Sequence, residues 1–179
     1  MNKFWCFAAA AVAVFGMSKA HAYGGSSKFH LGLSGLKYDT KVSGDTWNGK
    51  EERLHTDIKL GYVSDSGIYF GAVQSNYSES NSTSSPNRSS MGVTLGYRND
   101  GWLFDATYFL SSTYTNGSVK FEDGSGYGIE FGYNFQMSSS FYLGLELATK
   151  SLSYKKVNSV AANNTFTELM PLFNLGFYF

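Results

Sequence analysis

Cysteine and proline are nearly absent from this chain, and so is any long apolar run beyond its N-terminal segment. The single cysteine, Cys6, lies in that segment, so a disulfide framework is excluded for the remainder. No later stretch contains 18 consecutive apolar residues, which argues against a transmembrane helix there. The 14 basic and 14 acidic residues balance, and without basic blocks we expect no nucleic-acid partner.

The first 22 residues have the pattern of an export signal. Lys3 gives the short N-terminal part its positive charge, residues 4–17 are apolar, and Ala20 and Ala22 occupy the positions that signal peptidase reads. A retained anchor is disfavoured because the apolar part is too short to span a bilayer. We therefore expect a cleaved signal peptide at 1–22 and one mature domain at 23–179, with 12 basic residues, 14 acidic residues and no cysteine.

What the chain does have is a β-rich composition. Aromatic residues make up 17% of it and glycines number 20, while Ser, Thr and Asn supply much of the rest. Apolar residues alternate with small or polar ones, most clearly where Leu54, Ile58 and Tyr62 share one parity and Asp57 and Lys59 the other. A period of two is the pattern of a strand with two differently solvated faces.

Eight such runs are predicted, at 29–38, 54–63, 68–77, 90–98, 102–110, 127–135, 141–150 and 169–179. Two of them are ambiguous. In the first run Leu36 and Tyr38 change parity, and a β-bulge near Gly35 would explain the change. In the third run we favour an apolar face made of Tyr69, Val73 and Tyr77.

The segments between the runs alternate in length. Three are tight and rich in turn formers: Ser64–Gly67, Asn99–Gly101 and Met137–Ser140. The others are predicted as four longer polar loops: Asp39–Glu52, Ser78–Ser89, Asn116–Ser125 and Lys155–Thr165. Short and long connections alternate in this way in outer-membrane barrels, with short turns in the periplasm and long loops outside.

The residue types on the polar parity distinguish a membrane barrel from a soluble β-sandwich or lipocalin. These positions carry mostly Gly, Ser, Thr and Asn, whereas a soluble surface usually carries many more Lys and Glu. Small polar residues suit the crowded interior of an eight-stranded barrel. The pattern therefore predicts an all-β, eight-stranded, antiparallel up-and-down transmembrane β-barrel, apolar outside and polar inside.

Aromatic residues are expected to form two girdles at the bilayer interfaces. The girdle beside the short turns and the C-terminus comprises Tyr62, Tyr69, Tyr97, Trp102, Tyr133, Phe135, Phe141 and Phe177. The girdle near the long loops comprises Tyr77, Tyr108, Tyr114, Tyr127, Tyr154 and Phe166.

The chain ends on an alternating apolar set, Phe173, Leu175, Phe177 and Phe179. This ending resembles the C-terminal signature of outer-membrane barrel proteins, and the whole mature chain resembles small barrels of the OmpA/OmpX type. The resemblance implies that the barrel assembly machinery binds the last strand. It also implies location in the outer membrane of a Gram-negative bacterium, with the termini in the periplasm and the loops outside.

Eight charged residues fall on the inward parity. Glu168 is one, and the other seven form the predicted lumen charge network: Asp57, Lys59, Arg98, Asp105, Glu130, Glu146 and Lys150. Buried charges need partners, so we expect pairing around Lys59 with Glu130 or Glu146 as acceptors. The favoured interpretation is a plug that closes the lumen. The alternative is a narrow, gated, cation-preferring pore.

An enzymatic barrel is disfavoured. The mature chain has only two histidines, His30 and His55, and both fall on the inward parity, away from lipid substrates. Barrels that resemble lipid A deacylases carry a His-x-Ser pair near the C-terminus, and no histidine follows His55. We therefore expect no catalytic site, cofactor or metal.

These observations predict a monomeric barrel with a structural or surface-interaction role, in contact with the bilayer and lipopolysaccharide. Trp47, central in the first long loop, is a candidate for surface contact. A small gated pore for ions or small solutes is the first alternative, and a lipid A-modifying enzyme is the second.

Overall fold

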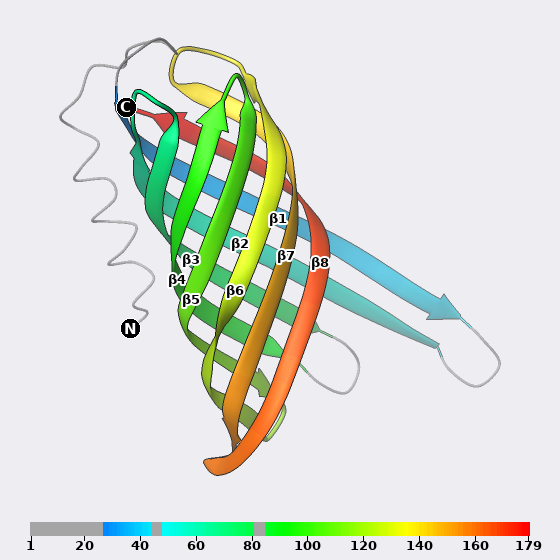
Figure 1. The fold of residues 1–179 in the computed structure, drawn as a ribbon. Helices are drawn as coiled ribbons and strands as arrows, with labels where there is room; N and C mark the ends of the chain where they lie inside the picture. The colour runs from blue at the N-terminus through cyan, green and yellow to red at the C-terminus, as the bar shows by residue number, and fades with distance from the viewer. Residues whose placement is uncertain (1–26, 44–47, 81–84) are drawn as a thin grey trace, which may run out of the picture.

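The structure is a computed structural model that describes residues 27–43, 48–80 and 85–179. Eight antiparallel strands follow one another around a closed barrel, and β8 returns to pair with β1 (Figure 1). The strands are β1 (Lys28–Ser43), β2 (Asn48–Val63), β3 (Ile68–Ser80), β4 (Asn87–Asn99), β5 (Trp102–Asn116), β6 (Val119–Gln136), β7 (Phe141–Val157) and β8 (Val160–Tyr178). The predicted fold class is confirmed. The described residues include no helix that is long and apolar enough to cross a membrane.

The three tight turns lie where the turn-forming residues predicted them, at the end of the barrel that also holds both ends of the described chain. Asp100 and Gly101 both have positive φ, 48° and 86°, which is the two-residue turn that matches strand twist. At the same end the backbones of Phe29 and Phe179 exchange two hydrogen bonds of 3.1 and 3.0 Å. The first and last strands therefore close the ring at the very end of the chain.

The prediction of four long loops is wrong. Strands continue through most of those residues. In the β5–β6 hairpin only Gly117–Ser118 separate the two strands, and in the β7–β8 hairpin only Asn158–Ser159. Polar strand residues pair across these hairpins, for example the hydroxyls of Ser153 and Thr165 at 2.8 Å. The far end of the barrel thus consists of extended hairpins. Trp47 lies outside the described residues.

Two parity assignments are also wrong. The register between β1 and β2 runs without a break from Lys28 to Ser43, so there is no bulge at Gly35 and Leu36 keeps the inward parity. In β3, Tyr69 and Val73 are buried, whereas Ile68 and Phe70 are exposed on the outer face. The interior therefore accepts large apolar side chains, which the sequence pattern had assigned to the outside.

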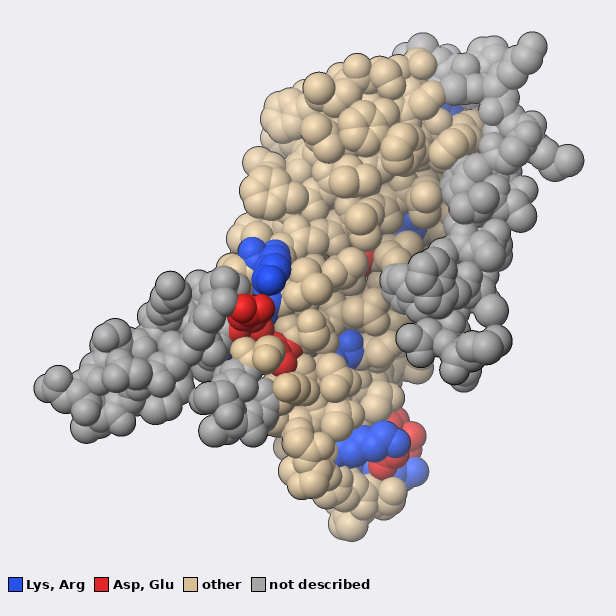
Figure 2. Space-filling model, turned by 180° about the vertical axis from the view of Figure 1, so that it is seen from behind, with Lys and Arg blue, Asp and Glu red and all other residues tan. Residues whose placement is uncertain are grey.

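The outer wall is apolar and the interior carries the charges. Leu95 is 60% exposed on the wall, whereas Asp105, on the neighbouring strand, is 0% exposed. Figure 2 shows few charged side chains over the wall, with Lys, Arg, Asp and Glu gathered toward the hairpin ends. Of the predicted girdle residues, Tyr69 and Tyr154 are buried instead of facing outward.

The barrel wall is incomplete between its first and last strands. Six residue pairs join β1 to β8, from His30–Tyr178 to Gly35–Phe173. Beyond Gly35, β1 continues to pair only with β2, and beyond Phe173, β8 continues to pair only with β7. Figure 1 shows the β1–β2 hairpin and the β7–β8 hairpin diverging from this point. We call the joined part the seam.

Candidate functional site: the polar interior

All seven residues of the predicted lumen charge network are buried in the barrel interior. Strand alternation explains this placement, because outward neighbours such as Leu60, Leu95 and Leu145 take the other parity. The structure divides the seven residues among three separate clusters.

The first cluster centres on Lys59 of β2. Its ammonium contacts the carboxylate of Glu130 on β6, and lies 3.1 Å from both oxygens of Glu146 on β7. The amide of Asn174 donates to Glu146 at 3.1 Å and to Asn134 at 2.9 Å. One cation is therefore shared by two carboxylates across the lumen, and the asparagines from β6 and β8 fix one of them in place.

The second cluster joins β2, β3 and β7. Lys150 donates to both carboxylate oxygens of Asp57 at 2.7 Å and to the hydroxyl of Ser75 at 2.8 Å. All three donor positions of the ammonium are thus used. A fully hydrogen-bonded buried ion pair of this kind fixes the relative position of the strands that supply it.

The third cluster lies toward the end with the tight turns. Arg98 donates to Asp105 at 2.8 Å, and its guanidinium lies 4.0 Å from the ring centre of Tyr69. His30 forms a 2.6 Å hydrogen bond with Tyr142, and its ring makes an edge contact with the ring of Tyr69. Large aromatic side chains and a paired arginine therefore fill the interior near the chain ends.

Toward the extended hairpins the interior becomes apolar. Val73, Phe109, Leu152 and Tyr154 form one buried cluster. A second comprises Ala148, Met170 and Leu172, with Leu36 packed against it. Beyond them Arg88 pairs with Glu168.

The sequence did not single out several residues of the interior: Ser75, Arg88, Asn134, Asn174, Tyr69, Tyr142 and Tyr178. Asn134 and Asn174 were on the inward parity, so strand alternation could have identified them. Arg88 was assigned to a long loop. Tyr69 was assigned to the outer wall because it lies beside a turn, where girdle aromatics are expected. An aromatic residue at that position suits the interior equally well.

The geometry offers little for catalysis. The carboxylate of Asp57 is bonded to Lys150, whose ammonium also donates to Ser75, and the ring of His55 packs 4.6 Å from the ring centre of Tyr77. In the part of the chain that the structure describes, no group of three His, Cys, Asp or Glu side chains is arranged to hold a metal ion.

Charged groups outside the apolar wall gather at the tips of the β5–β6 and β7–β8 hairpins. A hydrogen bond from Lys120, at 2.6 Å, lowers the pKa of Glu122, and bonds from Ser159 lower it further. A hydrogen bond from Lys156 lowers the pKa of Asp123, and the same contact raises the pKa of Lys156. These exposed contacts tie the two hairpin tips together.

The sequence matches no model of a protein family and no curated protein. Among solved structures, the chain is similar to the crystal structure of the outer membrane protein OprG from Pseudomonas aeruginosa. The two chains are 11% identical with a TM-score of 0.45, over 89% of this chain and 99% of OprG.

Proposed function

We propose that this protein is an integral barrel of the Gram-negative outer membrane, with a closed interior and a structural or surface-interaction role. The inverted distribution of polarity carries this proposal. Phe70, Leu95 and Phe173 are each at least 60% exposed on the wall, while seven charged side chains are buried inside. A soluble barrel has the opposite arrangement.

The length of the apolar wall fits a bilayer. On β8 the outward residues are apolar from Leu169 to Phe177, a span of nine residues, whereas Thr165 and Thr167 on the same face are polar. Transmembrane strands need about 9–11 tilted residues. We place the tight turns and both ends of the described chain in the periplasm and the extended hairpins outside, in agreement with the predicted signal peptide at 1–22.

The paired interior supports a plug over an open pore. Lys59 and Lys150 cross the lumen to bind carboxylates on other strands, so a solute would have to break buried ion pairs to pass. The proposal is tested by reconstituting the protein into planar bilayers. A folded, inserted sample that conducts no ions supports the plug, and steady cation-selective conductance would establish the pore instead.

The extended hairpins favour surface contact as the specific role. Strands that continue beyond the apolar wall present rigid polar surfaces, for which lipopolysaccharide and neighbouring envelope molecules are the proposed partners. The β5–β6 and β7–β8 hairpins can each be shortened while the two-residue turn is kept, and binding to cells or to lipopolysaccharide can then be measured. Unchanged binding in every shortened variant would leave only the structural role. No enzymatic activity is proposed.

The C-terminal set keeps its proposed role as the assembly signal. Phe173, Leu175, Phe177 and Phe179 line the outer face of β8, where assembly factors can reach them. Deleting Phe179 also removes its backbone bonds with Phe29, so Phe177→Ser is the cleaner test. We expect this variant to fold in detergent but to reach the outer membrane poorly.

A further inference from the structure

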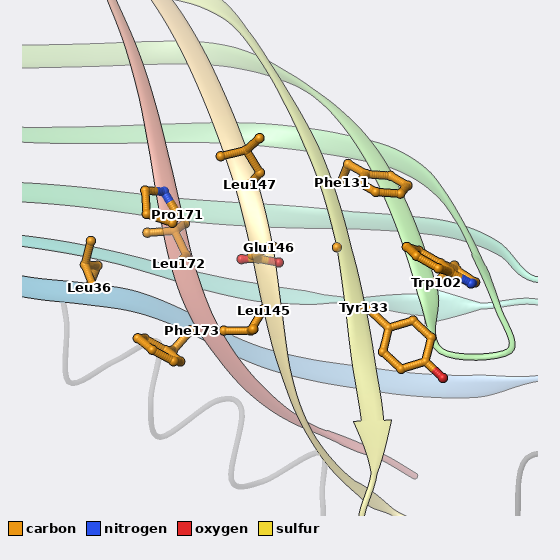
Figure 3. Close-up of a pocket in the computed structure, with 11 residues that line it drawn as sticks. Leu36, Trp102, Phe131, Tyr133, Leu145, Glu146, Leu147, Pro171, Leu172 and Phe173 are labelled. Carbon is orange, nitrogen blue, oxygen red and sulfur yellow. The ribbon is translucent and has the colours of Figure 1, made fainter.

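The outer wall contains an apolar groove of about 500 Å³ that ends at the seam (Figure 3). Trp102 and Phe131 line one part of it, Leu145 and Leu147 the middle, and Phe173 the part beside the seam. We call it the wall groove. The volume lies in the range of small-ligand sites, roughly 300–1,000 Å³.

The wall groove follows the hydrogen-bonding direction from strand to strand. Trp102 pairs with Tyr133, Tyr133 with Leu145, Leu145 with Phe173, and Phe173 with Gly35 of β1. Four intervals between strands, at about 4.8 Å each, give a length of roughly 19 Å. The groove is therefore long and runs across the strands, perpendicular to them, and it begins beside the Asp100–Gly101 turn.

At its other end the groove reaches the gap that opens where the seam ends, beyond Gly35 of β1 and Phe173 of β8. Leu36 and Leu172 line it there, although both have the inward parity. Leu36 is partly exposed there because β1 and β8 are not paired beyond Gly35 and Phe173, whereas Leu172, which is 1% exposed, lies behind it in the apolar interior. Outward apolar residues continue along β8 past this point, to Pro171 and to Leu169, which is 69% exposed.

The chemistry of the lining selects the occupant. Glu146 is the charged residue of the groove, and its carboxylate is turned inward to Lys59 and Asn174, so it offers no charge to an occupant. The groove is continuous with the apolar wall along its whole length. A flexible hydrocarbon chain fits this shape, whereas a polar solute would lose its hydration without new partners.

We propose that the wall groove holds one hydrocarbon chain of a bilayer lipid, with the end of the chain against Leu36 at the gap. This inference rests on the proposed membrane location. The bound lipid seals the barrel where backbone pairing stops, because it covers apolar side chains that the divergent hairpins leave open. It is a retained lipid, distinct from the lipids that exchange freely around the wall.

Native mass spectrometry tests this directly. The protein is reconstituted in phosphatidylcholine vesicles, extracted and washed in detergent, and we expect one retained phospholipid per barrel. Leu145→Trp fills the middle of the groove and should lower occupancy at least tenfold. Leu95→Trp is the control, because Leu95 on β4 is 60% exposed, against 51% for Leu145, but does not line the groove. Equal retention by the two variants, or none by the wild type, overturns the inference.

A second measurement does not depend on filling the groove. In Trp47→Phe, Trp102 is the only tryptophan of the predicted mature chain. After transfer from brominated phosphatidylcholine vesicles to lipid-free detergent, Trp102 should stay quenched. A tryptophan at position 104, made by Trp47→Phe, Trp102→Phe and Phe104→Trp together, should recover its fluorescence. Full recovery of fluorescence at both positions overturns only the inference of a bound lipid. Failure of the wild type to insert into vesicles overturns the proposed function as well.

Discussion

The ammonium of Lys150 lies 2.7 Å from both carboxylate oxygens of Asp57, which stands 93 residues earlier in the chain. Both side chains are 1% exposed. The pair links β7 to β2 across the interior, and the hydroxyl of Ser75 completes the coordination of the ammonium. Lys59 is on the same face of β2 as Asp57, but its ammonium binds Glu130 and Glu146, so the cation that pairs with Asp57 comes from β7 once the barrel closes.

Lys150→Met should destabilise the barrel strongly. The substitution leaves the Asp57 carboxylate buried without its cation, which typically costs about 3–5 kcal/mol. Unfolding in urea from phosphatidylcholine vesicles measures the loss. Lys150→Met combined with Asp57→Asn should recover most of it, because the double variant buries no charge at this position.

The exposed pair Lys37–Glu52 provides the matched control. Its side chains are 61% and 40% exposed, so Lys37→Met should change the free energy of unfolding by no more than about 1 kcal/mol. Equal costs at Lys150 and Lys37 would contradict the burial argument.

Lys59→Ala should convert a barrel that conducts no ions into one that conducts cations selectively. The variant leaves Glu130 and Glu146 facing each other without the shared ammonium, so water and cations replace it. Single-channel recording measures the conductance. Adding Glu130→Gln and Glu146→Gln should abolish the selectivity for cations. A folded Lys59→Ala barrel that remains silent would show that other side chains close the lumen.

Sequence alternation was sufficient for the strands whose two faces differ in residue type. In β2 and β4 the apolar and polar parities are distinct, and the structure keeps them. It failed in β3, because Tyr69 fills the interior below Arg98 while Phe70 faces outward, so both parities are aromatic. It also failed at Leu36, where the interior itself is apolar and covers Leu172.

The long loops were mispredicted for a different reason. Outside the membrane both faces of a strand meet water, so Ser, Thr and Asn occupy both parities and the period of two disappears. Hydroxyl pairs such as Ser151–Thr167 and Ser153–Thr165 hold these strands together without an apolar signal. Partners inside the barrel were only partly predictable, because which strands face one another depends on the register at closure.

Gly101→Ala should cost more stability than Gly117→Ala. Both glycines have positive φ, 86° and 59°, where a side chain adds about 1–2 kcal/mol. A Cβ at Gly101 would also meet the carbonyl oxygen of Asn134 at 2.7 Å, while one at Gly117 meets nothing within 4 Å. Urea unfolding of both variants separates backbone strain from the clash. Equal costs would show that the turn at Gly101 relaxes freely.

Acid should loosen the hairpin tips. The pKa values of Glu122 and Asp123 are lowered in the folded state by Lys120 and Lys156, from ordinary values of 4.5 and 3.8. Their stabilising contribution is therefore complete above those ordinary values and is lost as the pH falls through the lowered ones. The amide of Ser159, which donates to Glu122 at 3.1 Å, should then exchange its hydrogen faster.

Glu122→Gln is the control for this effect. Its Ser159 amide should exchange at a rate that, after correction for intrinsic pH dependence, stays nearly constant through the acid range. If the wild type behaves in the same way, the carboxylate does not hold the tip.

Leu95→Arg should impair insertion far more than Asn87→Arg. Both residues face outward on β4, but Leu95 lies in the middle of the apolar wall and Asn87 lies beyond it. An arginine near the bilayer midplane costs about 2–4 kcal/mol, and one near the interface about 0–1 kcal/mol. Folding into phosphatidylcholine vesicles, measured by urea titration, gives both values. Because the two substitutions add the same charge to the same strand face, only depth in the bilayer separates them, and equal costs would mean that the wall of this barrel does not face lipid.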